Sequence, residues 1–359
     1  MNNKSINIIQ LRAIIICAVV GIGIVTLPRD LANKIGTAYW LAISLGTIII
    51  LLAGLIIVKL MSYYPKQDIL QISKQIVGKY LASLIIVILI IYFLLVASAT
   101  TRFTTGLVNI WMLQLTPTKY LILSIIFVVS YLVLKDVEGI ARFSTTFLTL
   151  CVGAIVLPII LTAGHIKLYY IQPFLHTNLT QVFQGTKASL LSLLGVETLL
   201  IFHKFVNETT RIKKVVIYSH IFIGILYIVL LGVTIGYFGV DQIKTFVYPT
   251  LTLFRSVDLH LFIFERFELF FLLLWMACAI TSIGIYFFCG CYLMKLLLPK
   301  FHIGIIVLIA GTICYFTANY PKNIQENLKL LQLAGNLGLI PMLVIPSVLL
   351  IVGKVRGKI

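Results

Sequence analysis

The chain has 359 residues, of which 60% are hydrophobic and 11% charged, and its mean hydropathy is +1.09. Because an average soluble domain carries about 25% charged residues, this composition excludes an ordinary soluble protein and predicts an integral membrane protein. The net charge of +17 is typical of nucleic-acid binders, but the basic residues are spread over short loops instead of forming one stripe. We therefore expect contact with the lipid bilayer and none with nucleic acid.

Ten apolar segments separated by short polar loops predict an all-α membrane protein with ten transmembrane helices. Lys4 and Arg12 precede the first apolar core as in a signal peptide, but no small-residue cleavage site follows. We therefore expect an uncleaved first helix. The predicted spans are residues 8–31, 38–63, 81–111, 121–134, 145–164, 185–205, 215–238, 267–297, 303–316 and 330–352.

Lysine and arginine residues concentrate in one alternate set of loops, and loops with this bias lie in the cytoplasm. Both ends of the chain belong to the same set, as an even number of spans requires. We therefore expect both termini in the cytoplasm. The basic residues of this set are Lys4, Lys59, Lys66, Lys74, Lys79, Lys135, Arg142, Lys204, Arg211, Lys213, Lys214, Lys295, Lys300, Lys354, Arg356 and Lys358.

The first span has a glycine-rich centre, at residues 20–24. Glycine lets a backbone leave helical geometry, and a break within the membrane is tolerated only where it faces protein or a watery cavity. Free amides at residues 21–24 would attract a carboxylate, and free carbonyl groups near Ala18 and Leu194 an ammonium. The first span therefore predicts a site for a zwitterionic amino acid. Close helix packing at the glycines is the alternative.

A second interrupted segment, residues 189–198, carries a glycine beside an acidic residue. The two glycine breaks are equivalent if five helices are followed by five, and an odd number per repeat inverts the second repeat. Such paired breaks indicate a substrate site at the middle of the membrane. We expect one membrane domain of two inverted repeats, residues 1–164 and 165–359, with helices 1 and 6 broken. The expected substrate-binding residues are Ala18, Val20, Gly21, Ile22, Gly23, Ile24, Leu194, Gly195, Val196 and Glu197.

Polar residues within the predicted spans are candidates for a gate or an ion pathway. A carboxylate in lipid is costly, so Glu197 should face a cavity or a partner. It could contact the substrate ammonium, act as a proton-sensitive gate or clamp the broken helix, and the sequence leaves these open. Arg102 could pair with Glu197 or Glu268, or extend to the outer interface. Tyr92 could line the cavity or only pack. The candidates are Tyr92, Arg102, Glu197 and Glu268.

Nothing in the sequence indicates an enzyme, a metal site or a bound cofactor. The six cysteines lie in apolar spans without neighbouring histidines, and most of the six histidines lie at span ends. No phosphate-binding loop, nucleophile elbow or dinucleotide-binding fingerprint is present. We therefore expect no catalytic residue and no cofactor.

Two motifs carry a resemblance to known membrane proteins. The stretches GIGIVTLP in the first span and SLLGVE in the sixth resemble the amino acid–polyamine–organocation transporter superfamily. Within it the chain resembles the spore germination permease family, the B subunits of nutrient germinant receptors. The compact ten-span length and the run Phe264-Glu265-Arg266-Phe267-Glu268 followed by Trp275 carry this closer resemblance.

The resemblance implies a receptor subunit in the inner membrane of the dormant bacterial spore. It implies that the protein binds a germinant, commonly an amino acid, and acts with a larger A-type membrane subunit and a C-type lipoprotein subunit. The alternative is an autonomous amino acid transporter coupled to protons through Glu197 or Glu268.

Overall fold

The computed structural model describes residues 5–21, 23–175, 177–256 and 267–358 of the chain. Within them, six helices are long and apolar enough to cross a membrane. They confirm a multi-pass, all-α membrane protein. These helices are α3 (Tyr39–Tyr63), α5 (Lys79–Trp111), α7 (Asp136–Thr162), α10 (Ile212–Phe238), α13 (Phe267–Leu297) and the continuous pair α15 (Ile324–Leu339) and α16 (Ile345–Val355), which a π-helical turn joins.

Two further spans are broken, and they are the two that the sequence predicts to be broken. α1 (Ile8–Val19) and α2 (Gly23–Lys34) meet at an angle of 47°. α8 (Leu179–Ser192) and the helical stretch Val196–Phe205, which contains α9 (Leu199–Phe202), meet at 43°. The prediction of breaks in the first and sixth helices is therefore confirmed.

Two shorter apolar helices lie where the sequence predicts the fourth and ninth spans. They are α6 (Thr118–Leu134) and α14 (Ile303–Asn319), each of 17 residues. With six long spans and two broken ones, they would complete ten. Because each is shorter than the ~20 residues that usually cross a bilayer, the count of ten stays a prediction.

Two helices, α7 and α8, begin earlier than the apolar pattern indicates, because their first turns are polar. α7 begins nine residues before the predicted span at residue 145, with acidic residues in its first turn, which suit the positive end of the helix dipole. α8 begins at a capping box in which Asn178 and Gln181 satisfy each other's backbone amides. The short helices α4 (Ile69–Val77), α11 (Val240–Thr245) and α12 (Pro249–Arg255) were not predicted.

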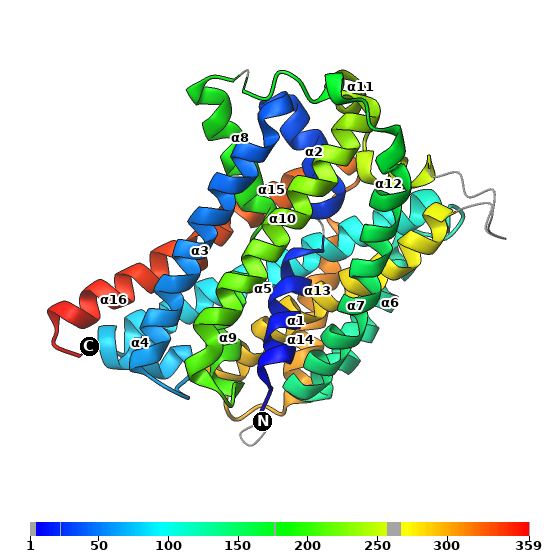
Figure 1. Cartoon of the computed structure of the whole chain (residues 1–359). Coiled ribbons are helices and arrows are strands. Elements are labelled where there is room, and N and C mark those ends of the chain that lie inside the picture. Colours follow the sequence, from blue (N-terminus) through cyan, green and yellow to red (C-terminus); the bar gives the residue numbers. More distant parts are fainter. Residues whose placement is uncertain (1–4, 22, 176, 257–266, 359) are drawn as a thin grey trace.

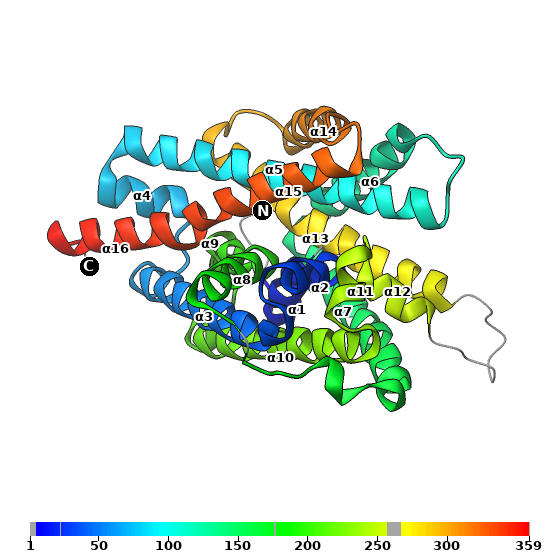
Figure 2. The same ribbon diagram turned by 90° about the horizontal axis from the view of Figure 1, so that it is seen from above.

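The two broken spans lie side by side in the interior of the bundle. Figure 2 shows α1, α2, α8 and α9 between one group that includes α3, α7 and α10 and another that includes α5, α13 and α15. α1 packs against α7, α10 and α13, and α8 packs against α2 and α3. Helices that surround the breaks can therefore supply partners for their backbone.

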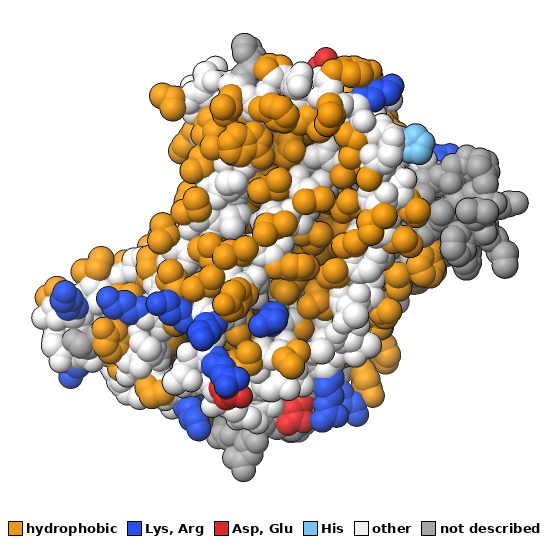
Figure 3. All heavy atoms as spheres, viewed as in Figure 1, with side chains coloured by type: hydrophobic (Ala, Val, Ile, Leu, Met, Phe, Trp, Pro, Cys, Tyr) orange, Lys and Arg blue, Asp and Glu red, His pale blue; other side chains and the backbone are white. Residues whose placement is uncertain are grey.

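The surface supports the membrane assignment. On the face in Figure 3, hydrophobic side chains cover the middle and upper part, and lysine and arginine side chains gather along the lower part. The chain start lies at this lower end in Figure 1. There the Ile6 amide donates to the Phe205 carbonyl at 2.8 Å and the Asn207 amide to the Ile6 carbonyl at 3.3 Å. The first residues are thereby attached to the lower end of the second broken span.

Candidate functional site

A cavity of about 170 Å³ lies beside both helix breaks, and we call it the chamber. An apolar cavity of about 150 Å³ is large enough to hold benzene, so the chamber has room for one small organic molecule. It is lined by Ala18, Val19, Gly23, Thr26, Asp30, Lys34, Tyr92, Val96, Thr100, Ala188, Leu191, Ser192, Leu194, Ser282, Tyr286, Leu328, Leu331, Gln332, Ala334 and Gly335.

One face of α2 forms a wall of the chamber. Gly23, Thr26, Asp30 and Lys34 follow one another at spacings of three and four residues, which places them on the same helix face. Gly23 is the first residue of α2, so amide groups of the first turn have no partner within the helix and carry the positive end of its dipole. This wall therefore begins with an arrangement that suits an anionic group.

The C-terminal end of α8 forms the neighbouring wall, through Ala188, Leu191 and Ser192. The last carbonyl groups of a helix lack intrahelical partners and carry the negative end of its dipole. A Cβ atom at Gly23 would lie 2.7 Å from the Ser192 carbonyl oxygen, closer than real contacts allow. α2 and α8 therefore approach each other at a point where only glycine fits.

The two breaks also touch each other. Gly195 has a φ of 152°, a conformation that side-chain-bearing residues rarely adopt. A Cβ atom there would lie 2.6 Å from Cγ2 of Val19. The Gly195 amide donates to Oε2 of Glu197 at 2.8 Å, and its carbonyl accepts from the Thr198 hydroxyl at 2.6 Å. The second break therefore satisfies its own backbone at Gly195.

The backbone of the first break is satisfied by side chains of neighbouring helices. The Ser282 hydroxyl donates to the Ala18 carbonyl at 3.2 Å, and the Trp275 indole N–H to the Gly21 carbonyl at 2.9 Å. The Tyr227 hydroxyl donates to the Val19 carbonyl at 3.3 Å. The expectation of a free carbonyl group at Ala18 is therefore wrong. Backbone groups that a helix break frees inside a membrane protein need hydrogen-bond partners, and here side chains of neighbouring helices supply them. The end of α8, where the last carbonyl groups of a helix lack intrahelical partners, can offer carbonyl groups to an ammonium.

Glu197 lies behind the chamber wall and does not line the chamber. Its side chain is fully buried, and its Oε1 accepts hydrogen bonds from the hydroxyls of Tyr92 at 2.6 Å and Tyr286 at 3.3 Å. Both tyrosines line the chamber. The carboxylate therefore joins α5, α13 and the second break, and any effect on a ligand passes through the two phenols.

The other expected substrate-binding residues separate into two groups. Ala18, Gly23 and Leu194 line the chamber, as Tyr92 does among the gating candidates. The remaining expected residues that the structure describes are buried beside the chamber without lining it: Val20, Gly21, Ile24, Gly195, Val196 and Glu197. Ile22 lies outside the described residues.

Of the remaining gating candidates, Arg102 lies away from Glu197. The Arg102 guanidinium donates to the Pro321 carbonyl at 2.8 Å. Pairing of Arg102 with Glu197 is therefore absent, because tyrosine hydroxyls and the Gly195 amide occupy that carboxylate. Glu268 lies in α13, and its side chain is outside what the structure describes.

Sequence reasoning missed several chamber residues. Thr26, Asp30 and Lys34 share a helix face with Gly23, and this spacing was the signal that could have identified them. Ser282 and Gln332 come from α13 and α15, more than 240 residues further along the chain. No sequence pattern indicates that these two would meet α2.

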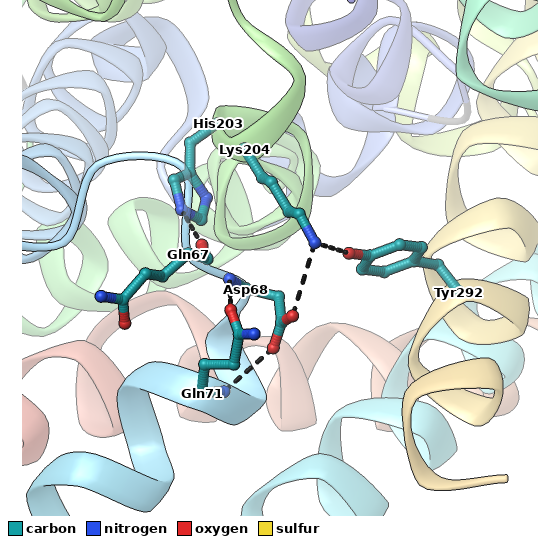
Figure 4. A network of polar contacts seen from close by, with 6 residues as sticks. All are labelled: Gln67, Asp68, Gln71, His203, Lys204 and Tyr292. Atoms are coloured by element: carbon teal, nitrogen blue, oxygen red, sulfur yellow. Dashed lines mark hydrogen bonds and ion pairs between the residues drawn. The ribbon is translucent and has the colours of Figure 1, made fainter. Parts of the chain in front are cut away.

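At its opposite end, the second broken span is held by a polar network (Figure 4). Asp68 caps α4 by accepting from the Gln71 amide at 2.9 Å, and its other oxygen lies 3.5 Å from Nζ of Lys204. The Lys204 ammonium also donates to the Tyr292 hydroxyl at 3.3 Å. Nε2 of His203 lies 2.8 Å from the Gln67 carbonyl oxygen. We call this set of contacts the lower network. Together with the stacked rings of nearby phenylalanines, it packs this side of the bundle.

The chamber contains no metal-binding cluster among the described residues. No group of three His, Cys, Asp or Glu side chains there is arranged to hold a metal ion. What the chamber lining offers to small polar molecules is a helix N-terminus, a helix C-terminus, hydroxyl groups, one carboxylate and one ammonium.

Sequence comparison shows what the chain is similar to. A family model described as "Spore germination protein" matches residues 5–327. Spore germination protein YndE of Bacillus subtilis is 26% identical over 350 residues, which cover 97% of this chain and 96% of the relative. Spore germination protein A2 of the same organism is 26% identical and covers 78% and 77%. Spore germination protein GerLB of Bacillus cereus is 23% identical and covers 86% and 83%.

Comparison with solved structures shows the fold. MhsT in complex with L-phenylalanine matches with a TM-score of 0.67 at 13% identity, over 96% of this chain and 97% of that one. Mhp1, a nucleobase-cation-symport-1 family transporter with bound bromovinylhydantoin, matches with a TM-score of 0.65 at 12% identity, over 94% and 78%. The chain therefore has the fold of these transporters.

Proposed function

The chain belongs to the spore germination protein family, and from this premise we propose that it is the membrane subunit of a germinant receptor that binds a small nutrient, an amino acid, in the chamber. It acts by binding, without catalysis. The observation that carries the proposal is the position of the chamber beside both helix breaks, where the N-terminus of α2 faces the C-terminal end of α8. A zwitterion presents the opposite charges to these two ends.

We propose that the ligand carboxylate binds the first-turn amides of α2 at Gly23 and that the ligand ammonium binds carbonyl groups at the end of α8. One observation supports this polarity. The carbonyl groups of Ala18 and Gly21 already accept hydrogen bonds from Ser282 and Trp275, so the first break offers mainly its amides. The choice of an amino acid as ligand is supported separately by the solved structure of MhsT, which has the same fold and contains bound L-phenylalanine.

Binding is transmitted through Tyr92 and Tyr286. Both side chains line the chamber and both donate to Glu197, which is anchored to the Gly195 amide. A ligand that contacts either phenol therefore acts on the second break. A ligand shifts a conformational equilibrium only by its difference in affinity between the two states, so the contacts to these tyrosines must differ between them.

We propose that the subunit resides in the inner membrane of the spore with both termini in the cytoplasm. There it passes the change in the bundle to a larger A-type membrane subunit and a C-type lipoprotein subunit. The gathering of lysine and arginine side chains on the lower part of the molecule supports the orientation, since cytoplasmic loops are enriched in these residues.

The test is ligand binding by the purified full-length chain in lipid nanodiscs, measured as thermal stabilisation by each of the common L-amino acids. At least one should stabilise the wild type. Gly23→Ala should abolish that stabilisation, because the added methyl group meets the Ser192 carbonyl oxygen at 2.7 Å. Gly106→Ala is the matched control, since a Cβ atom at this glycine within α5 meets nothing within 4 Å. Equal binding by the two variants would remove the ligand from the breaks.

The transporter fold favours one second candidate function, autonomous proton-coupled uptake of an amino acid. Uptake of the stabilising amino acid into liposomes that contain only this chain, driven by a pH gradient, would support it. Loss of spore germination on deletion of the gene, with normal uptake by vegetative cells, would support the receptor.

A further inference from the structure

The chamber contains two charged side chains that have no partner in the described part of the chain. The Asp30 carboxylate and the Lys34 ammonium both line the chamber, and each side chain is half-buried. Neither forms a hydrogen bond or an ion pair with a described residue. The charges of Lys34 and Arg29 act on Asp30 only from a distance, without a direct contact. Since a charge that is partly removed from water gains from a direct partner, both side chains can still accept one from a ligand.

Asp30 and Lys34 are spaced along α2 so that they could form an ion pair, and the absence of that ion pair is therefore informative. They are four positions apart on α2, with the acidic residue first, which is the orientation that favours an ion pair on a helix surface. Side chains at this spacing have Cβ atoms about 5–6 Å apart and can reach each other. Here both side chains border the cavity and the ion pair is not formed. The space between them is therefore available to a group that carries both charges.

The pair lies well away from the helix breaks. Asp30 is seven residues beyond Gly23, or about 10 Å along the helix axis, and Lys34 is eleven residues beyond it, or about 16 Å. Gln332 of α15 also lines the chamber and is exposed, so it marks the mouth. Its amide offers both a donor and an acceptor.

We propose that Asp30, Lys34 and Gln332 form a second binding position, the distal subsite, for small dipolar molecules such as amino acids. The Asp30 carboxylate takes the ligand ammonium, the Lys34 ammonium takes the ligand carboxylate, and the Gln332 amide contacts either group. This inference rests on the proposed function, because it describes how the same chamber admits its ligand. The distal subsite selects zwitterions over singly charged molecules before they reach Gly23.

Charge complementarity favours a zwitterion over other small ligands. A simple anion would be attracted by Lys34 and repelled by Asp30. A simple cation would be attracted by Asp30 and repelled by Lys34, so neither ion is stabilised by both side chains. A molecule with both charges gains from both. An uncharged apolar molecule would leave both charges unpaired and less hydrated.

The test uses three matched probes with the full chain in nanodiscs: L-alanine, propionate, which lacks the ammonium, and ethylamine, which lacks the carboxylate. Binding is measured by saturation-transfer NMR. Lys34→Gln should weaken L-alanine and propionate binding about tenfold, since a charge-assisted contact is lost, and should strengthen ethylamine binding, since a repelling charge is lost. Asp30→Asn should weaken L-alanine and ethylamine binding about tenfold and should strengthen propionate binding for the same reason. Lys119→Gln, which removes an exposed positive charge outside the chamber lining, is the control and should change none.

The outcomes separate this inference from the proposed function. If L-alanine binds Asp30→Asn and Lys34→Gln as it binds the wild type, but fails to bind Gly23→Ala, the distal subsite is wrong and the site at the breaks stands. If the two charge variants lose binding and Gly23→Ala retains it, the distal subsite stands and the site at the breaks is wrong. Absence of L-alanine binding to the wild type would overturn the distal subsite.

Discussion

At the scale of single residues, the most informative group is the Glu197 carboxylate with its two phenols. A buried carboxylate is tolerated when donors satisfy it, and here Tyr92, Tyr286 and the Gly195 amide do so. The two tyrosines make the same kind of contact to the same oxygen, but at 2.6 Å and 3.3 Å. Short hydrogen bonds to a charged acceptor are the strong ones. Removing one hydroxyl at a time therefore compares a short and a long hydrogen bond to the same Glu197 oxygen.

We predict that Tyr92→Phe lowers the free energy of unfolding by about 2 kcal/mol and Tyr286→Phe by less than about 1 kcal/mol, since a hydrogen bond to a charged group contributes about 1.5–3 kcal/mol and a long one less. Each change removes one hydroxyl and keeps the ring. The measurement is the denaturant or thermal midpoint of the protein in one detergent. Equal losses of unfolding free energy in the two variants would contradict this prediction, because they would mean that both hydroxyls stabilise the Glu197 carboxylate to the same extent.

Prediction of the site residues was limited because the sequence does not show which face of each helix points toward the chamber. Gly21 and Gly195 were singled out because glycine lets a backbone leave helical geometry, although the glycines within α3, α10 and α13 leave those helices continuous. Asp30 was missed although its spacing from Gly23 placed it on the same face. Ser282 could not be found, because α13 is apolar around its whole circumference and gives no sign of which face meets the break. For Glu197 the sequence left open a ligand contact, a gate and a clamp of the broken helix; its side chain lies behind the tyrosines that line the chamber.

At the scale of elements, the second broken span is held at opposite ends by different means. Its upper part borders the chamber, and its lower part is bound by the first residues of the chain and by the lower network. The helix breaks and the long spans were predictable from apolar length and glycine position. α4 was not, because its start depends on a polar cap at Asp68 that follows a loop and not on an apolar segment.

Asp68 has two roles that substitution can separate. Asp68→Asn keeps an oxygen that caps α4 and removes the charge opposite Lys204, whereas Asp68→Ala removes both. We predict that Asp68→Asn lowers the free energy of unfolding by about 1–3 kcal/mol, between the values for exposed and buried ion pairs. Asp68→Ala should lose about 1 kcal/mol more, for the cap. Thermal unfolding in detergent measures both.

The control for this prediction is an exposed ion pair of similar composition. Asp241 lies 2.8 Å from Lys244, and the Asp241 side chain is 97% exposed. The Lys244 ammonium lowers the pKa of the Asp241 carboxyl through a hydrogen bond, but water screens the pair. Asp241→Asn should leave the midpoint unchanged. A loss equal to that of Asp68→Asn would show that burial of the lower network contributes nothing.

At the scale of the whole molecule, the chamber and the lower network lie on opposite sides of the breaks. We infer that the chamber is reached from the side that lies away from the network. The exposed Gln332 and the half-buried Lys34 border the mouth, whereas Glu197, Phe202 and Phe288 are fully buried on the way to the network. With the orientation proposed from the basic loops, the mouth faces away from the cytoplasm. A nutrient that arrives from outside would then find the chamber open.

This asymmetry predicts the sidedness of chemical labelling. All six native cysteines are free and buried, so a membrane-impermeant maleimide should react slowly with the wild type. Thr26→Cys, in the chamber wall, should react when the reagent is added to the outside of right-side-out vesicles. Ser62→Cys, at the exposed end of α3 on the basic side, should react only when the vesicles are opened. L-Alanine should slow the labelling of Thr26→Cys and leave that of Ser62→Cys unchanged, because only the first thiol lies where the ligand binds. Labelling of both cysteines from the same side would place the mouth of the chamber on the side of the lower network and contradict the proposed access route.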